Sequence, residues 1–448
     1  MSTEQPHRQC PSIQEPLDPL AAQTRRLDLV SSLLSAGVLA VIEMGGAIAK
    51  KGFHAGDMEV ALLTSGQSAG LILSFFIAHM AASRPKMPLI FWPEVLSRLF
   101  LASIFFLRPT FALAFVVLHA LAQMLQAMTV PARITIYRLN YPTERRGGIV
   151  GRIRQVQLLL TAAAALAMSV ALDWNLGTEG IVRLLGPSPL PANVLIRWVI
   201  PGLAALGILG SCIFRQAAVR EDLSALRPQG TLGDTFRRFL KVYREDRDFR
   251  RYENFFFIFG FANIMSIPLT QIHAVDVLGA SYMDLALINV VLVQGVMAMT
   301  MAFWGRQLDR YSPGALRGIL NVIFSVDFLI LGIAPSIGWV YVGRIFRGVA
   351  MGGGTLIWML GALWYARSKE DVPVYLGIHT VLTGLRWLVA PFAGVLLKWA
   401  FGQSARPIFL ISFVVVLVAA IYMIIECRRQ PPRKALEEPM PAPRTTGA

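Results

Sequence analysis

Long runs of apolar residues, separated by shorter polar segments, fill most of this chain. An apolar run of about 20 residues spans the hydrocarbon core of a bilayer as a helix. Windows of about 19 residues detect such runs. They predict twelve membrane-spanning helices, at 28–49, 58–81, 89–107, 110–137, 148–172, 194–214, 252–275, 282–303, 315–334, 338–365, 373–399 and 406–426. The pattern therefore predicts an all-α polytopic membrane protein.

The composition agrees with this pattern. Of the 448 residues 55% are hydrophobic and 15% are charged, and the mean hydropathy is +0.56, whereas soluble domains carry about 25% charged residues. The three cysteines, Cys10, Cys212 and Cys427, suggest neither a disulfide framework nor a metal site. The sequence contains no nucleotide-binding loop, metal-ligand cluster or nucleophile–base arrangement, so we expect no enzyme and no cofactor.

The net charge of +15 has a topological explanation. Most of the 42 Lys and Arg residues lie in the two tails and in the loops on the same side as the tails. This asymmetry follows the positive-inside rule and predicts that both termini are cytoplasmic. We therefore expect a multi-pass protein of the bacterial cytoplasmic (inner) membrane, surrounded by lipids, and not a nucleic-acid-binding protein.

A polar segment at 215–251 divides the predicted spans into two sets of six. Within it, one helical face is apolar and the remainder is mostly charged, which is typical of an amphipathic helix at a membrane interface. The predicted organisation is a cytoplasmic tail (1–27), a first six-helix bundle (28–214), a linker (215–251), a second bundle (252–427) and a disordered tail (428–448). The first tail lacks an apolar core, so we expect no cleavable signal peptide there.

The two halves resemble each other in sequence, which favours an internal duplication. "MEVALL" at 58–63 matches "MDLALI" at 283–288, and "HMAASRPKMP" at 79–88 aligns with "GRQLDRYSPG" at 305–314. The second alignment pairs Arg84 with Arg310. Parallel halves of this kind place a solute site near the midplane, between them.

The segment "GRQLDR" at 305–310 resembles the G-x-x-x-D-R/K signature of the major facilitator superfamily, and it lies between the eighth and ninth spans, as in that family. Gly305, Asp309 and Arg310 match the signature. In the first-half copy His79 and Ser83 replace Gly and Asp, and only Arg84 remains. The resemblance implies two pseudo-symmetric six-helix bundles that work by alternating access. It also implies that this loop either gates the two states or only anchors the topology.

Ionisable groups inside spans cost at least about 2.5–3.5 kcal/mol at the bilayer centre, so each needs a partner or a purpose. Glu43 lies in the outer half of the first span, which lines the cavity in the family, and is our candidate for a coupling proton. The alternatives are a structural pair or a water-exposed position near the outer mouth. Arg386, in the middle of the eleventh span, either faces the cavity as an anion clamp or counter-charge for Glu43, which is the favoured interpretation, or pairs structurally. Arg133 is a candidate for substrate contact, although snorkelling to the inner interface is the favoured interpretation.

Other charged groups have simpler interpretations. Asp327 and Arg344 lie at equal depth on antiparallel spans, so we expect them to form a structural ion pair. The sequence offers no such partner for Arg347. Glu94 and Arg98 are four residues apart on one helix and should neutralise each other.

Uncharged polar groups within the spans either line the cavity or join helices. The candidates are Gln123, Gln126, Asn263, Gln271, Asn289 and Gln294. His379 is expected to be a hydrogen-bonded packing residue. The glycines of "GVAMGGGT" (348–355) favour close helix packing.

The leading functional hypothesis is a secondary active transporter that moves a small solute by alternating access, with proton coupling suggested by Glu43. The alternative is a non-transporting protein of similar fold that acts in assembly or signalling. Interior arginines favour an anionic or zwitterionic solute, and we expect a monomer.

Overall fold

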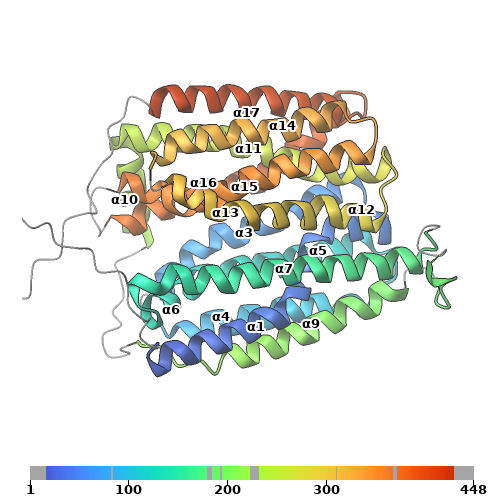
Figure 1. The fold of residues 1–448 in the computed structure, drawn as a ribbon, viewed down its shortest axis with the longest axis horizontal. Coiled ribbons are helices and arrows are strands. Elements are labelled where there is room, and N and C mark those ends of the chain that lie inside the picture. Colours follow the sequence, from blue (N-terminus) through green and yellow to red (C-terminus); the bar gives the residue numbers. More distant parts are fainter. Residues whose placement is uncertain are drawn as a thin grey trace, which may run out of the picture.

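A computed structural model describes residues 17–81, 84–178, 184–191, 194–221, 232–308, 310–366 and 371–427. The described residues form helices that lie side by side in two groups (Figure 1). The first group contains α1 (Pro19–Glu43), α2 (Gly45–Ala47), η1 (Ile48–Gly52), α3 (Asp57–Ala81), α4 (Lys86–Ala102), η2 (Ser103–Phe106), α5 (Ala112–Met128), α6 (Val130–Asn140), α7 (Thr143–Asn175) and α9 (Val194–Phe214). The second contains α11 (Arg247–Asp276), α12 (Tyr282–Ala286), η4 (Leu287–Val291), α13 (Leu292–Leu308), α14 (Pro313–Ile333), α15 (Ile337–Tyr365), α16 (Val372–Ala400) and α17 (Arg406–Cys427).

Each of the twelve predicted spans coincides with one helix or with consecutive helices of this series, so the prediction is confirmed. Within the described ranges, nine helices are long and apolar enough to cross a membrane, or ten if the bent pair Pro19–Glu43 and Gly45–Gly52 is one span. The 25-residue α3 and the 29-residue α15 complete the two six-helix bundles. The first helix begins at Pro19, earlier than predicted, because Asp18 caps it by accepting a hydrogen bond from the Ala21 amide.

The packing of helices repeats between the two bundles, as the predicted duplication requires. In the first bundle α1 packs on α7 and α9, α3 packs on α5, and α4 packs on α5 and α9. In the second bundle α11 packs on α16 and α17, α13 packs on α15, and α14 packs on α15 and α17. The two sets correspond pair by pair in chain order.

Glycines allow the closest of these approaches. A Cβ atom on Gly66 of α3 would lie 2.6 Å from the Cα atom of Ala120 on α5. On α15, a Cβ atom on Gly348 would lie 2.8 Å from Cβ of Val296, and one on Gly353 would lie 2.7 Å from Leu320. The predicted close packing around 348–355 is therefore confirmed, and it is the small-residue contact that membrane helices use.

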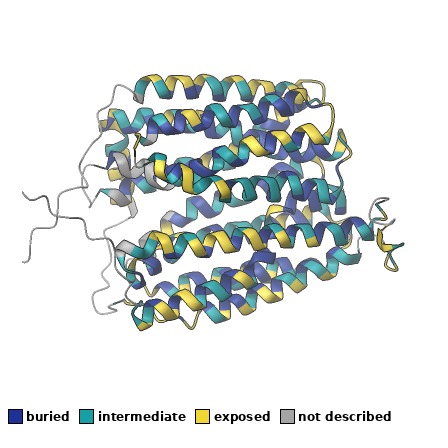
Figure 2. Cartoon of the chain, viewed as in Figure 1, coloured by how far each residue is buried: buried dark blue, intermediate teal, exposed yellow. Residues whose placement is uncertain are grey.

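The outer flanks of the molecule are apolar, as expected for surfaces that contact lipid. Exposed residues lie along the outside of the helices, whereas buried residues line the inside (Figure 2). Large side chains such as Trp92, Trp198 and Val418 are more than half exposed.

The described chain begins and ends at one end of the molecule, next to the linker helix α10 (Leu232–Glu245) (Figure 1). We call this the α10 end and the other the opposite end. Phe239 of the predicted amphipathic helix is buried against Gly377 of α16, and Arg238 pairs with Asp371 at 2.7 Å. The linker helix is thus docked on the second bundle.

The loop with the family signature also lies at the α10 end. Ser312 caps α14 by accepting a hydrogen bond from the Ala315 amide at 3.3 Å. Arg84 and Arg310 are exposed and Gly305 is half-buried, while Asp309 lies outside the described residues. The gating role of this loop stays a prediction.

Candidate functional site

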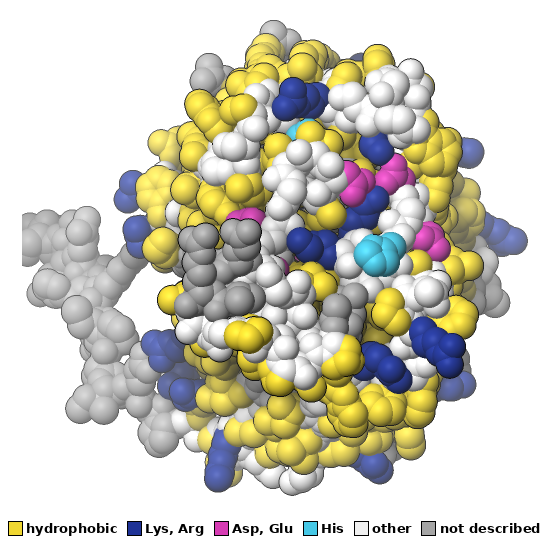
Figure 3. Space-filling model, turned by 90° about the vertical axis from the view of Figure 1, so that its right-hand side faces the viewer, with side chains coloured by type: hydrophobic (Ala, Val, Ile, Leu, Met, Phe, Trp, Pro, Cys, Tyr) yellow, Lys and Arg dark blue, Asp and Glu magenta, His cyan; other side chains and the backbone are white. Residues whose placement is uncertain are grey.

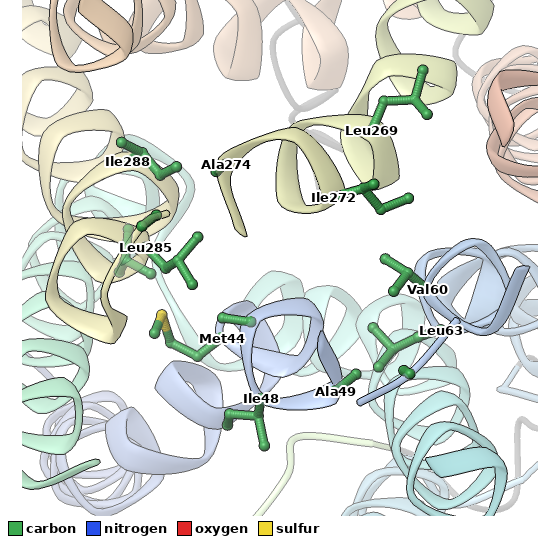
Figure 4. Close-up of a cluster of buried hydrophobic side chains, with 14 of the residues drawn as sticks. Met44, Ile48, Ala49, Val60, Leu63, Leu269, Ile272, Ala274, Leu285 and Ile288 are labelled. Carbon is green, nitrogen blue, oxygen red and sulfur yellow. The ribbon is translucent and has the colours of Figure 1, made fainter. Parts of the chain in front are cut away.

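A cluster of buried apolar side chains joins the two bundles at the opposite end (Figure 4). The first bundle contributes side chains from the end of the first span and from α3, and the second contributes side chains from α11, α12 and η4. The labelled members are Met44, Ile48, Ala49, Val60, Leu63, Leu269, Ile272, Ala274, Leu285 and Ile288, each no more than 4% exposed. We call this the closing cluster, because it fills the space between the bundles at that end.

Charged side chains cover the closing cluster. Lys50 pairs with Asp57 of its own bundle at 3.3 Å and with Asp276 of the other bundle at 2.8 Å. Asp57 also pairs with Lys398 of the other bundle at 2.5 Å. Figure 3 shows basic and acidic side chains gathered in the middle of this end. We call these four residues the latch.

A second set of contacts between the bundles, which joins α7 to α12, uses backbone groups. The carboxylate of Asp173, near the end of α7, accepts hydrogen bonds from the amides of Tyr282 (2.9 Å) and Met283 (2.8 Å) in the first turn of α12. A carboxylate is stabilised there by the free amides and the helix dipole. Lys51 donates to the carbonyl oxygen of Ala280 at 2.6 Å. These hydrogen bonds and ion pairs between the bundles therefore lie at the opposite end, and the packing of α3 on α16 continues to the middle of the spans, where Gly384 lies against Ser68 and Ile72.

The first span is broken at Glu43, immediately before Met44 of the closing cluster. Helix α1 ends there, and the segment Gly45–Gly52 continues at an angle of 51°. Leu39, one turn earlier, lines a hollow inside the first bundle, and Met44 joins the closing cluster. Glu43 itself is exposed, and it makes no hydrogen bond or ion pair with another described residue. It is thus a carboxylate without an ion-pair partner among the described residues, at the bend that leads into the closing cluster.

Two predicted polar candidates pair with each other beside this break. Gln271 of α11 and Asn289 of η4 exchange hydrogen bonds of 2.7 and 3.1 Å. A Cβ atom on Gly46 would lie 3.0 Å from Cγ of Gln271, so the pair sits against the first bundle. Both side chains serve helix packing within the second bundle at this position.

A network of buried charges lies inside the first bundle, closer to the α10 end. Arg133 bonds to Asp28 at 2.9 Å and to Glu94 at 2.5 Å, while Arg98 pairs with Glu94 at 3.5 Å. Ser211 also donates to Glu94 at 2.7 Å. Arg133 therefore turns into the bundle, and the interpretation that it snorkels to the interface is wrong. The predicted Glu94–Arg98 pair is present as part of this larger network.

The network borders a small hollow between α1, α4, α5, α6 and α7. Its lining includes Ser31, Ser35, Gln126, Arg133 and Gln157. Gln126 accepts a hydrogen bond from Arg98 at 3.3 Å. Gln123, in contrast, is half-buried and makes no hydrogen bond to another described residue.

The second bundle holds its own charge cluster. Arg344 pairs with Asp327 at 3.2 Å, which is the ion pair expected from the sequence. Arg347 pairs with the same carboxylate at 3.3 Å, donates to Asn263 at 3.0 Å and lies over the Phe324 ring at 4.6 Å. These contacts explain Arg347, and they place Asn263 in this cluster.

Arg386 does not lie in the space between the bundles, contrary to the sequence-based expectation. Its side chain is 2% exposed, donates to Thr383 at 2.8 Å and to the carbonyl oxygen of Phe256, and lies over the Phe256 ring at 4.6 Å. The side chain points from α16 towards α11, so it neither lines the space between the bundles nor pairs with Glu43. His379 accepts or donates a hydrogen bond with Glu253 at 2.9 Å, as expected for a packing histidine.

Several residues of the site were not predicted from the sequence. Asp28 lies at the predicted start of the first span, and Asp173 and Lys398 lie at the ends of theirs, where charge is common. His119 is fully buried on α5 next to the break at Glu43. Arg317 is buried in α14 over the rings of Phe256 and Phe259. A lone polar residue in an apolar span was the available signal for His119.

No group of three or more His, Cys, Asp or Glu side chains capable of holding a metal ion occurs among the residues that the structure describes. Asp28, Glu94 and Asp327 bind arginines instead. The arrangement combines a sealed opposite end, an unpaired carboxylate at a helix break and two internal charge networks.

No protein-family model and no curated protein matches the chain. Solved structures do resemble it. A bacterial homolog of the human lysosomal transporter Spinster, in an inward-facing and unoccupied conformation, aligns with a TM-score of 0.64 and 15% identity over 92% of this chain and 98% of that one. A mutant of the nucleoside transporter NupG aligns with a TM-score of 0.65 and 12% identity over 91% and 99%. The human organic anion transporter MFSD10 aligns with a TM-score of 0.61 and 14% identity over 91% and 100%. The chain therefore has the major facilitator superfamily fold.

Proposed function

We propose that the protein is a secondary active transporter that moves a small solute by alternating access, and that the structure represents its inward-facing state. The observation that carries this proposal is the one-sided closure between the bundles. The closing cluster, the latch and the Asp173 contacts all lie at the opposite end, while Glu43, at the bend that leads into the cluster, is exposed. Rocking of the two bundles would break these contacts and open the opposite end.

The orientation follows from the charge distribution. The described chain begins and ends at the α10 end, and most Lys and Arg residues of the sequence lie in the segments predicted for this side, so the positive-inside rule supports a cytoplasmic location for it. We propose the bacterial inner membrane as the location.

Glu43 is the proposed site of proton coupling. A carboxylate inside the membrane is costly unless it has a partner or a function, and Glu43 has no partner among the described residues. A proton gained from one side and lost to the other would couple the solute to the proton gradient. The expected preference for an anionic solute loses its support, because the interior arginines Arg133, Arg347 and Arg386 are bound to protein acceptors.

The transport proposal is tested with purified full-length protein. A thermal-shift screen against a broad solute library finds compounds that stabilise the protein, since a ligand stabilises the state that it binds. Uptake of such a compound is then measured in proteoliposomes with and without a pH gradient. Glu43→Gln should remove the effect of the gradient, whereas Glu245→Gln, an exposed residue of the linker helix, should not.

Unchanged pH dependence in Glu43→Gln would end the coupling hypothesis. The absence of both a stabilising solute and any uptake would instead favour a non-transporting protein.

The inward-facing assignment has a separate test. In a cysteine-free background, a cysteine at position 43 should react with a hydrophilic maleimide that is applied from the α10 side, because this position is exposed. A cysteine at Leu285, inside the closing cluster, is the matched control and should react slowly from either side. Equal reaction rates at the two positions would contradict the assignment.

A further inference from the structure

The break in the first span has an unusual neighbour. His119 of α5 is fully buried, and its Nε2 atom lies 3.3 Å from the carbonyl oxygen of Ile42, the residue before Glu43. The imidazole ring also lies over Gly45, just after the break. A Cβ atom there would come within 2.5 Å of Cε1 and 2.9 Å of Cδ2. The ring therefore occupies the space that a side chain at position 45 would need.

Aromatic contacts hold the histidine in this place. Phe115, one turn earlier on α5, lies 5.5 Å from the imidazole and stacks at 4.4 Å on Phe53, which follows η1. The ring thus belongs to a column that ties α5 to both sides of the break. Carbonyl groups at a helix end lack partners within the helix and need donors from elsewhere. His119 supplies such a donor to the Ile42 carbonyl, which also accepts a hydrogen bond from the Met44 amide.

We propose that His119 is a positioning residue for Glu43. With the proton on Nε2, the imidazole donates to the Ile42 carbonyl, holds the bend between α1 and Gly45–Gly52, and so directs the Glu43 carboxylate into the space between the bundles. Gly45 is the complementary requirement, because only a residue without a side chain leaves room for the ring. The importance of this role for coupling rests on the proposed function of Glu43, but the geometric claim does not.

The test measures the exposure of Glu43 without a solute. Full-length protein in lipid nanodiscs is treated with a water-soluble carbodiimide and an amine nucleophile, and the amide formed at Glu43 is quantified by mass spectrometry. Glu43→Gln defines the background at this position. His119→Leu removes the donor, and it should lower the labelling rate about fivefold, the change in population that one net hydrogen bond supports. His119→Gln places an amide nitrogen near the position of Nε2 and should keep the rate within about twofold of the wild type.

Two results would overturn the proposal. The first is a wild-type labelling rate in His119→Leu, even if its melting temperature falls, because a purely structural role would lower stability alone. The second is identical behaviour of His119→Leu and His119→Gln, which would show that the donated hydrogen bond is irrelevant.

A pair of size variants keeps the proposal testable if His119→Leu fails to fold. Gly45→Ala should displace the ring and lower the labelling rate of Glu43, and the double variant Gly45→Ala/His119→Ala should recover part of the lost melting temperature while its labelling rate stays low. Wild-type labelling in Gly45→Ala would refute the contact. Labelling of Glu43 does not require transport. These outcomes therefore test the role of His119 even if the protein proves not to be a transporter.

Discussion

Arg133 shows how buried charges stabilise one another in this protein. It bonds to two carboxylates, Asp28 and Glu94, that are each no more than 1% exposed on the side chain. Removal of one member of a buried pair leaves an uncompensated charge, which costs much more than the pair itself contributes. The structure therefore depends on Arg133 more than on an arginine at the surface.

Substitution of Arg133 should be strongly destabilising. Arg133→Met is expected to lower the free energy of unfolding by about 3–5 kcal/mol, because it leaves Asp28 without its ion-pair partner. The exposed Arg84→Met is the control and should stay within about 0.5 kcal/mol. Thermal unfolding in detergent measures both, and Asp28→Asn added to Arg133→Met should recover part of the loss. Equal stability of the two single variants would show that the network contributes little.

Individual contacts were predictable from the sequence where helical spacing or depth decides them, as for Glu94 and Arg98, which are four residues apart on one helix. Asp327 and Arg344 could be paired because antiparallel spans place them at equal depth. Arg386 could not be placed in this way, because depth says nothing about the direction in which a side chain leaves its helix. It points towards Phe256 of α11, and a single sequence does not reveal which neighbour lies on that side.

At the scale of helices, glycines set the distances between neighbours. Gly66 and Gly70 of α3 face α5, and a Cβ atom on Gly70 would lie 2.6 Å from that of Ala127. Gly348 and Gly353 of α15 do the same towards α13 and α14. The spacing of small residues predicted such contacts for 348–355, but the equivalent role of α3 needs the partner helix to be known.

Alanine substitutions should separate the packed glycines from the open ones. Gly70→Ala is expected to destabilise the protein by about 1–3 kcal/mol, because the added methyl group collides with α5. Gly151→Ala, on α7, meets no atom within 4 Å and should be neutral or stabilising by up to about 1 kcal/mol, since alanine favours the helix. The melting temperature of Gly70→Ala should therefore fall, while that of Gly151→Ala should stay unchanged or rise. An unchanged or higher melting temperature of Gly70→Ala would mean that the α3–α5 contact is looser than the structure indicates.

For the whole molecule, two seams hold the bundles together at the opposite end. One seam joins α3 to α16 and carries the Asp57–Lys398 pair, and the other joins α7 to α12 through Asp173. The two bundles and their spans were predictable because hydropathy reports directly on membrane burial. The conformation of the protein was not, since under the proposed transport cycle the same residues would have to satisfy both an inward-facing and an outward-facing arrangement.

Loss of the latch should shift the balance between these arrangements. Lys398→Gln is expected to raise the population open at the opposite end by about fivefold or more, the usual scale of such couplings. This population is reported by the distance between two spin labels, one on α3 and one on α16, which double electron–electron resonance measures. Arg406→Gln is the matched control, because Arg406 lies at the same end but bonds to Ala334 of its own bundle. Distance distributions in Lys398→Gln that match the wild type would contradict the assignment of the latch.

The two seams should also differ in how mutations can repair them. At the α3–α16 seam both partners are side chains, so a damaging change at Asp57 can be compensated by a reciprocal change at Lys398. At the other seam Asp173 binds main-chain amides, which every residue except proline provides. The two hydrogen bonds therefore do not depend on which side chains occupy positions 282 and 283, and these positions offer no compensating mutation when Asp173 is lost. A genetic screen for suppressors of Asp173→Ala should consequently recover changes elsewhere in the molecule.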